Sequence, residues 1–495
     1  MLPLLALISI VLSRGHQAEV VPEPPMSSVP AVAVLTPGVG LGESVEPERW
    51  VGSIELPGME LGFAVRFEQG EDGSWSGYLD IPMQGLADGE LSEVAYSDSA
   101  IGFVFEIPNQ PEANWPRFSF EIDESGQSAS GVLRQAGGEY PATLELDADG
   151  SADLMPRPQT PVRPLPYREE SVVVPAGEHE LAGTLTLPDE QQFGAGPYPA
   201  VVFISGSGPQ DRDETILGHK PFFVISDALA KRGIAGLRCD DRGFGESTGD
   251  FAESTTLDFA DDVRACISYL KGRDEIGRIG LIGHSEGAMI APMVAAGNED
   301  VGFVVLLAGP GVTGKEILVR QTHDITAQAG MDEASLEAQR ELQTDLLDRV
   351  VAGAGEDELR EVMMELIQIQ LGDEDLPDDQ VEAMIDQQIG MMTSPWMRTF
   401  LTVDPRPALR EMTQPVLVLN GSLDLQVVAD QNLPEIEKAL AEAGNTDVTI
   451  VELEGLNHLF QPAQTGALDE YASIETTFDE AAMKRIGDWI LEHVR

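Results

Sequence analysis

The chain has 495 residues, 42% of them hydrophobic, which is enough for more than one globular domain and a large core. Its 85 acidic residues outnumber 30 basic ones and leave a formal net charge of -55 at pH 7. Such a charge repels polyanions, which argues against nucleic acid and anionic membranes as partners. The 7 histidines and 2 cysteines form no cluster at metal-ligand spacing, so we expect no metal and no cofactor.

Residues 2–12 form an apolar run that is too short to span a bilayer as a helix, so we expect no stable membrane insertion. The run has the length of a signal-peptide hydrophobic region, and we predict a signal peptide over residues 1–18 with export to the periplasm or the medium. No Lys or Arg precedes the run, which leaves a cytoplasmic protein as the alternative. Residues 19–48 are rich in Pro, Val, Gly and Glu without periodicity and predict a flexible lead-in.

Residues 49–154 contain short runs in which apolar and polar side chains alternate, for example at 62–67, 76–81 and 117–122. Turns rich in Gly, Asp and Ser separate them at a spacing of about 8 to 12 residues. This pattern predicts a small antiparallel β sandwich or barrel, which carries no obvious catalytic group and would be an accessory domain. A Pro-rich linker is expected over residues 155–168.

Beyond the linker, strand-like and helix-like segments alternate. Two extended runs at 171–174 and 181–187 predict an edge hairpin. Continuous β-branched and leucine runs follow and predict a mainly parallel sheet with helices on both faces, at 200–204, 233–237, 279–282, 303–307, 415–419 and 448–451. We assign residues 169–310 and 406–495 to this α/β catalytic domain.

The interval 311–405 interrupts this alternation. It reads as helical, acidic and methionine-rich, and it is far longer than the dozen or so residues that a crossover needs. We therefore predict an inserted helical cap. Its methionines either line an adaptable acyl pocket or pack between helices: Met363, Met364, Met384, Met391 and Met392.

Residues 283–287 read Gly-His-Ser-Glu-Gly, between the apolar run 278–282 and the helix-like segment 288–294. Strand, Gly-x-Ser-x-Gly and helix, in that order, are the nucleophile elbow of a serine hydrolase. The turn is so sharp that a Cβ at either glycine would collide with its surroundings. The serine, Ser285, is thereby placed at a helix N-terminus, where the dipole and free N–H groups favour a developing negative charge.

A second match to the same pattern, at residues 245–249, contains Ser247. A polar loop precedes it in place of a strand, and a helix can begin only near Thr256. We therefore interpret Ser247 as a loop serine.

A serine nucleophile needs a histidine base and a carboxylate that orients the base, and in this arrangement they follow later strands, acid first. The strand predicted at 415–419 is followed by Asp424, and the strand at 448–451 by His458. The sequence therefore predicts Ser285, Asp424 and His458 as the catalytic triad.

Each partner has a rival. Asp430 is the alternative acid, although residues 426–428 already read as the start of the next helix. His493 is the alternative base, but it lies in the predicted terminal helix, where a lone histidine is more often a surface or packed residue.

An oxyanion hole needs two backbone N–H groups directed at the carbonyl oxygen. We expect one from Glu286, the residue after the nucleophile. The other should come from the loop at 205–209, where we choose Ser207 with Gly208 as the neighbouring choice; a plain glycine turn is the alternative. A structural salt-bridged brace is expected behind this loop, formed by Asp211, Arg212, Asp213 and Arg242.

Four blocks in chain order resemble bacterial α/β hydrolases of the two-domain carboxylesterase and serine-aminopeptidase-like groups: residues 206–214, 240–247, 283–287 and 421–427. The resemblance covers about residues 170–495 and implies the same triad. The front β-rich region resembles the non-catalytic domain of those esterases more loosely. We expect hydrolysis of small to medium carboxylic esters, with a small-molecule ester as the binding partner. The alternatives are an aminopeptidase or amidase, and a non-enzymatic binding protein on a hydrolase scaffold.

Overall fold

The computed structural model describes residues 48–494 except 57–58, 71–72, 83–85, 108–111, 136, 149–151, 153, 156 and 372–377. The expected signal peptide at 1–18 and all but the last residue of the lead-in at 19–48 lie outside the described residues. The chain divides into two compact units that meet in sequence between Pro156 and Arg157. Within the described residues, no helix is both long and apolar enough to cross a bilayer.

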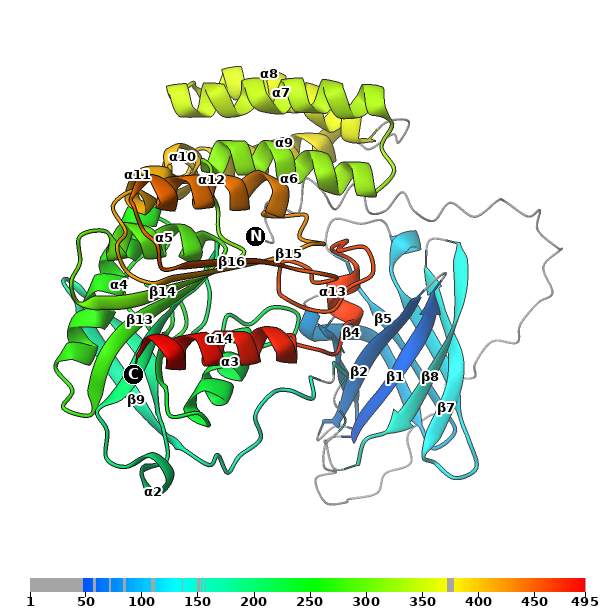
Figure 1. The fold of residues 1–495 in the computed structure, drawn as a ribbon. Helices are drawn as coiled ribbons and strands as arrows, with labels where there is room; N and C mark the ends of the chain where they lie inside the picture. The colour runs from blue at the N-terminus through cyan, green and yellow to red at the C-terminus, as the bar shows by residue number, and fades with distance from the viewer. Residues whose placement is uncertain are drawn as a thin grey trace. The chain divides into compact units, whose positions relative to one another are not determined.

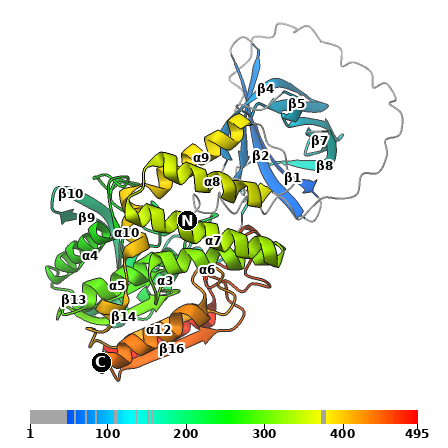
Figure 2. The ribbon, with the colours of Figure 1, turned by 90° about the horizontal axis from the view of Figure 1, so that it is seen from above.

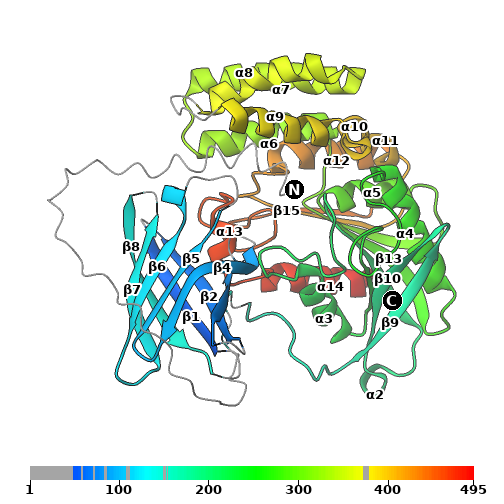
Figure 3. The same ribbon diagram turned by 180° about the vertical axis from the view of Figure 1, so that it is seen from behind.

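The N-terminal unit is a closed antiparallel barrel, which decides between the sandwich and the barrel that the sequence allowed (Figure 3). Its first strand pairs with its last, Trp50 lying opposite Leu146, so no strand edge is left open. Phe63 and Phe67 are among the aromatic residues that fill the interior. The strands are β1 Glu48–Leu56, β2 Met59–Gln69, β3 Trp75–Ile81, β4 Leu86–Ser97, β5 Ala100–Phe105, β6 Arg117–Ile122, β7 Ser128–Gln135 and β8 Gly138–Leu146; a short 3-10 helix, η3 Glu112–Asn114, precedes β6.

The C-terminal unit is built on an eight-stranded sheet with the order β16-β15-β14-β13-β11-β12-β10-β9 among the described residues (Figure 1). In the described sheet β10 runs opposite to the other strands, and the β9–β10 pair is the predicted edge hairpin. The strands are β9 Arg168–Ala176, β10 His179–Leu187, β11 Tyr198–Ile204, β12 Ala235–Cys239, β13 Ile276–His284, β14 Val301–Leu307, β15 Val416–Gly421 and β16 Val448–Leu453. Both faces of the central strands are buried, which explains their unbroken apolar sequences.

Helices cover both faces of this sheet, as the sequence predicted. The apolar sides of α4 Thr256–Lys271, α5 Glu286–Ala295 and α12 Ala429–Glu442 pack on one face. Those of α3 Pro221–Ala230 and α14 Glu480–His493 pack on the other. Short helices α2 Glu190–Phe193, α11 Arg406–Leu409 and α13 Glu470–Ser473 lie in the connections.

Between β14 and β15 the chain forms the helices of the cap, which lie outside the sheet. Figure 2 shows α6, α7 and α8 of the cap side by side. They are α6 Gly314–Gln328, α7 Glu333–Ala352, α8 Glu356–Leu371, α9 Asp378–Met392 and α10 Pro395–Thr402. The cap has its own apolar core, in which Met363 and Met392 are buried, so these two methionines pack between helices.

The segment that we expected to be a linker, residues 155–168, is from Arg157 onward part of the C-terminal unit. The Arg157 guanidinium donates to the carbonyls of Leu217 at 2.9 Å and Ala472 at 3.0 Å. The Gln159 side chain accepts from the backbone N–H of Thr477 at 2.7 Å. Proline content indicates an extended chain but carries no information on these distant hydrogen-bond partners. The sequence therefore predicted a linker that does not pack on either unit.

Candidate active site

Ser285 occupies a strained turn between β13 and α5. Its φ of 54° and ψ of -119° are unusual for a residue with a side chain. A Cβ at Gly283 would overlap the carbonyl oxygen of Gly287, and a Cβ at Gly287 would overlap that of Ile204. Only glycine fits at both ends of the turn, and the turn presents the serine at the first turn of α5, where N–H groups lack helical acceptors.

Asp424 and His458 come together although 34 residues separate them. His458 Nδ1 lies 2.8 Å from Asp424 Oδ2. The other carboxylate oxygen accepts the backbone N–H groups of Gln426 at 2.8 Å and Val427 at 2.9 Å, and Asn420 Nδ2 donates to Oδ2 at 3.3 Å. A carboxylate held by these donors accepts the Nδ1 proton, so the lone pair of His458 is on Nε2.

The histidine loop is bonded to the elbow itself. His284, the residue before the nucleophile, donates from Nε2 to the carbonyl oxygen of His458 at 3.0 Å, and the two rings are 4.8 Å apart. Its Nδ1 lies 3.0 Å from Glu214 Oε1. Burial disfavours a charged imidazole here, but the Glu214 carboxylate, the His458 carbonyl and the charge of Asp424 together raise the pKa of His284.

His458 Nε2 is buried and has no hydrogen-bond partner among the described residues. The hydroxyl of Ser285 therefore does not bond to it in this structure. A buried polar atom without a partner is costly and rare in folded proteins. Catalytic hydrogen bonds are often long without substrate, so an Nε2 kept unbonded beside the elbow is suited to receive a proton.

Two carboxyl groups, that of the buried Glu214 and that of the half-buried Asp241, shape the loop at 205–209, which follows β11. Gly206 N–H donates to Glu214 Oε1 at 2.7 Å. Asp241 accepts from Ser205 Oγ at 2.7 Å and from Gln210 N–H at 2.9 Å. The loop is therefore tied at its start and its end, with Ser207 and Gly208, our expected second donor and its neighbour, between the ties.

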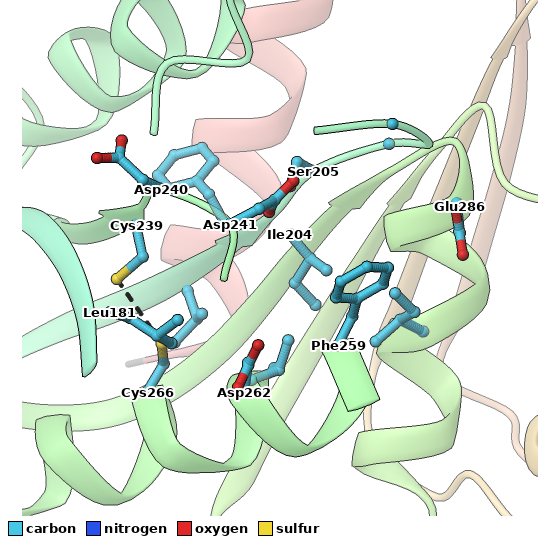
Figure 4. A pocket seen from close by; sticks show the side chains of 16 residues that line it. Leu181, Ile204, Ser205, Cys239, Asp240, Asp241, Phe259, Asp262, Cys266 and Glu286 are labelled. Atoms are coloured by element: carbon cyan, nitrogen blue, oxygen red, sulfur yellow. Dashed lines mark hydrogen bonds between the residues drawn. The ribbon is translucent and has the colours of Figure 1, made fainter. Parts of the chain in front are cut away.

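Behind this loop lies a small cavity of about 50 Å³ (Figure 4). Ser205, Asp241 and the two cysteines contribute to its lining. The sulfur atoms of Cys239 and Cys266 are 3.8 Å apart, and both thiols are free. Burial raises the pKa of Asp241 to about 8.

The expected brace behind the loop exists with different partners. Arg212 holds Asp240 at 2.6 Å and Glu246 at 2.6 Å. Among the described residues, no ion pair joins the other three residues of the expected brace: Asp213 pairs with Arg238, Arg242 pairs with Asp262, and Asp211 accepts from Thr215 Oγ1 and from the backbone N–H of Asp213. The spacing indicated ion pairs correctly, but the partners come from segments that the sequence did not connect to the loop.

A second cavity, of about 210 Å³, opens in front of the loop and is bordered by Ser285, Ser207 and Glu286. Its remaining lining is mostly apolar and comes partly from the cap, including Ile317, Leu318, Met391, Trp396 and Phe400. Met391 is therefore the predicted methionine that faces a pocket, whereas Met363 and Met392 are buried in the cap core.

Sequence reasoning missed the side chain of Glu286. The sequence assigns a role only to its backbone N–H, but the residue is 2% exposed and its carboxyl group accepts from Thr256 Oγ1 at 2.7 Å and from Trp396 Nε1 at 3.0 Å. Burial raises its pKa. The available signal was a glutamate at the start of a helix, α5, whose other residues are apolar or glycine.

The rival residues lie elsewhere in other roles. Ser247 Oγ donates to the carbonyl of Asp240 at 2.8 Å and accepts from Ala182 N–H at 2.9 Å. Asp430 is exposed in the first turn of α12, which begins at Ala429, and pairs with Arg320 at 3.1 Å. His493 Nε2 lies 3.1 Å from Asp447. Among the described residues, no cluster of His, Cys, Asp or Glu is arranged to hold a metal ion.

Comparison with known proteins matches residues 201–469, more than half of the chain, to the alpha/beta hydrolase family. Esterase EstD of Thermotoga maritima is 33% identical over 193 residues, which are 37% of this chain and 45% of that protein, so the match spans less than half of the relative. An esterase from Pyrococcus furiosus superposes with a TM-score of 0.40 at 15% identity, over 66% of this chain and 93% of that one. Est1E from Butyrivibrio proteoclasticus gives a TM-score of 0.38 at 14% identity, over 66% and 98%.

Proposed function

Because the chain belongs to the alpha/beta hydrolase family, we propose that it is a serine esterase that cleaves small to medium carboxylic esters through an acyl-enzyme on Ser285. His458 is the general base and acid, and Asp424 orients it. The local likeness to Esterase EstD supports this reaction class. The observation that carries the proposal is the buried His458. Its Nδ1 lies on Asp424, its Nε2 has no partner among the described residues, and its backbone is bonded to the elbow that presents Ser285.

In the acylation step, His458 Nε2 takes the proton of Ser285 as Oγ attacks the ester carbonyl carbon. The carbonyl π electrons move onto oxygen, and the backbone N–H groups of Glu286 and Ser207 bind the resulting oxyanion. The tetrahedral intermediate then collapses, the bond to the alcohol oxygen breaks, and His458 gives its proton to the departing alkoxide.

In the deacylation step, a water molecule replaces the alcohol. His458 removes one proton from the water as the oxygen attacks the acyl carbon, and the second intermediate collapses with return of that proton to Ser285 Oγ. Asp424 remains a carboxylate throughout and stabilises the imidazolium that forms in each half-reaction.

Ester cleavage is favoured over aminopeptidase activity by the 210 Å³ cavity. An aminopeptidase must bind a terminal ammonium, which needs an acidic partner. Of the described residues that line this cavity, Glu286 alone has a carboxyl group, and the Thr256 and Trp396 side chains already donate to it. The cavity is therefore suited to an uncharged group.

Replacement of the nucleophile tests the proposal. Ser285→Ala should lower kcat on a short aryl ester by roughly 10⁴ to 10⁶ and abolish labelling by a fluorophosphonate probe, with the fold retained. Ser247→Ala is the comparison, because it removes the serine of the other Gly-x-Ser-x-Gly match, and labelling should persist. More than a tenth of wild-type activity in Ser285→Ala, or loss of labelling only in Ser247→Ala, would overturn the assignment.

A further inference from the structure

The carboxyl group of Glu286 joins three separate segments beside the proposed nucleophile. Thr256, at the start of α4, donates to it at 2.7 Å. The indole N–H of Trp396, at the start of cap helix α10, lies 3.0 Å from both of its oxygens. The side chain of Ser207 in the oxyanion loop also hydrogen-bonds to it. The elbow is thus bonded directly to the cap.

Trp396 is held on two sides. Its ring stacks on Phe400, one turn later in α10, at 5.4 Å between centroids and 22° between planes. Both rings line the 210 Å³ cavity that reaches Ser285. The indole is therefore a wall of this cavity, and the hydrogen bonds to Glu286 set its position relative to the nucleophile.

The lining of the cavity indicates which part of the ester it receives. Ser285, Ser207 and Glu286, the proposed nucleophile and oxyanion residues, border the cavity, whereas His458 does not. The alcohol must leave toward His458, since this residue protonates it in the proposed reaction. The group inside the cavity is therefore the acyl chain.

The cavity volume sets the size of that chain. An apolar protein cavity of about 150 Å³ holds one benzene molecule, with six carbon atoms. On that scale 210 Å³ accommodates about eight carbons, again by comparison with a benzene-sized cavity. Burial of each methylene contributes about 0.8 kcal/mol, which converts to about a fourfold gain in kcat/KM per methylene until the cavity is full.

We propose that Trp396, held by Glu286, is the specificity-determining residue for the acyl group and limits it to an apolar chain of about eight carbons. This inference rests on the proposed esterase function. Trp396→Phe keeps an aromatic wall but removes the N–H that Glu286 holds. Trp396→Ala removes the wall.

The experiment measures kcat/KM for aryl esters of acyl length from about two to about twelve carbons, a range that brackets the size expected from the cavity. Wild type should rise to an optimum near eight carbons and then fall. Trp396→Ala should move the optimum to longer acyl chains. In Trp396→Phe, the decrease in kcat/KM for chains longer than the optimum should be about tenfold smaller than in wild type, which is the effect expected from the loss of one hydrogen bond. For acetyl esters of alcohols of increasing length, neither Trp396 substitution should alter how kcat/KM depends on alcohol length.

Trp489→Phe is the matched control, because the buried indole N–H of Trp489 has no partner among the described residues and its ring packs on Phe303. It should keep the wild-type length profile. An unchanged profile in both Trp396 variants, or a shift in the alcohol series alone, would overturn this inference while wild-type hydrolysis still supports the esterase. A wild-type protein that neither cleaves any ester nor reacts with a fluorophosphonate would overturn the proposed function itself.

Discussion

Asp424→Asn tests the orientation of the proposed base with almost no change of shape. The Asp424 carboxylate receives Gln426 N–H and Val427 N–H on one oxygen, and His458 Nδ1 and Asn420 Nδ2 on the other. An asparagine retains the first pair through its amide oxygen. Its amide nitrogen then faces His458 and can only donate a proton.

The expected loss of kcat follows from this exchange of a hydrogen-bond acceptor for a donor. His458 would accept at Nδ1 and carry its proton on Nε2, the atom that must be free to act as base. The equivalent change in a serine protease costs about 10⁴ in kcat, which corresponds to about 5.4 kcal/mol of transition-state stabilisation. Asn420 Nδ2 keeps its hydrogen bond to the Val427 carbonyl at 2.9 Å, so loss of its contact with Asp424 should lower stability by only about 1 kcal/mol, the net contribution of one hydrogen bond.

The assay is kcat/KM on a short aryl ester, with a urea titration to show that the variant is folded. Asp430→Asn is the matched control, because Asp430 is exposed and pairs only with the nearby Arg320 in the described structure. It should remain within a factor of two or three of wild type, as expected for an exposed ion pair. Activity of Asp424→Asn within tenfold of wild type, or collapse in Asp430→Asn alone, would refute this assignment of the acid.

Three further predictions concern stability and domain organisation. Gly287→Ala should unfold the protein or lower its Tm sharply in calorimetry, because the new Cβ would overlap the Ile204 carbonyl. Gly355→Ala is the control, because a Cβ there has open space around it, and its Tm should not fall in this way. Equal melting temperatures of the two variants would contradict the turn geometry. Burial raises the folded pKa of Asp241 to about 8, so its contribution to stability is present below its unfolded pKa of 3.8 and is lost as pH rises through about 8. Asp241→Asn should flatten the fall in unfolding free energy between about pH 4 and 8, and an unchanged slope would show that another group causes it. A fragment of residues 157–495 should keep ester hydrolysis. It should melt at a higher temperature than a fragment of residues 169–495, which lacks the Arg157 and Gln159 hydrogen bonds. A higher melting temperature for the shorter fragment would show that these bonds do not stabilise the unit.

The sequence by itself was sufficient for features that depend on near neighbours in the chain. The glycines at 283 and 287 identify the elbow because the turn brings residue 283 against the carbonyl of Gly287, a steric requirement that acts within five residues. Unbroken apolar runs predict strands buried on both faces, and the length of the interval at 311–405 predicts the cap. The order of strand ends also placed Asp424 and His458 at the same sheet edge, since parallel strands bring their carboxyl ends together.

Tertiary structure alone decided which distant groups meet. Alternation in the front region is the same for a sandwich and a barrel, and only the pairing of β1 with β8 distinguishes them. Hydrogen bonds join Arg212 to Asp240 over 28 residues of sequence, Glu286 to Trp396 over 110 residues, and Arg157 to Ala472 over 315 residues. Local propensity carries no information about such pairs, because a hydrogen bond depends on where two segments lie in space and not on the residues that flank either of them.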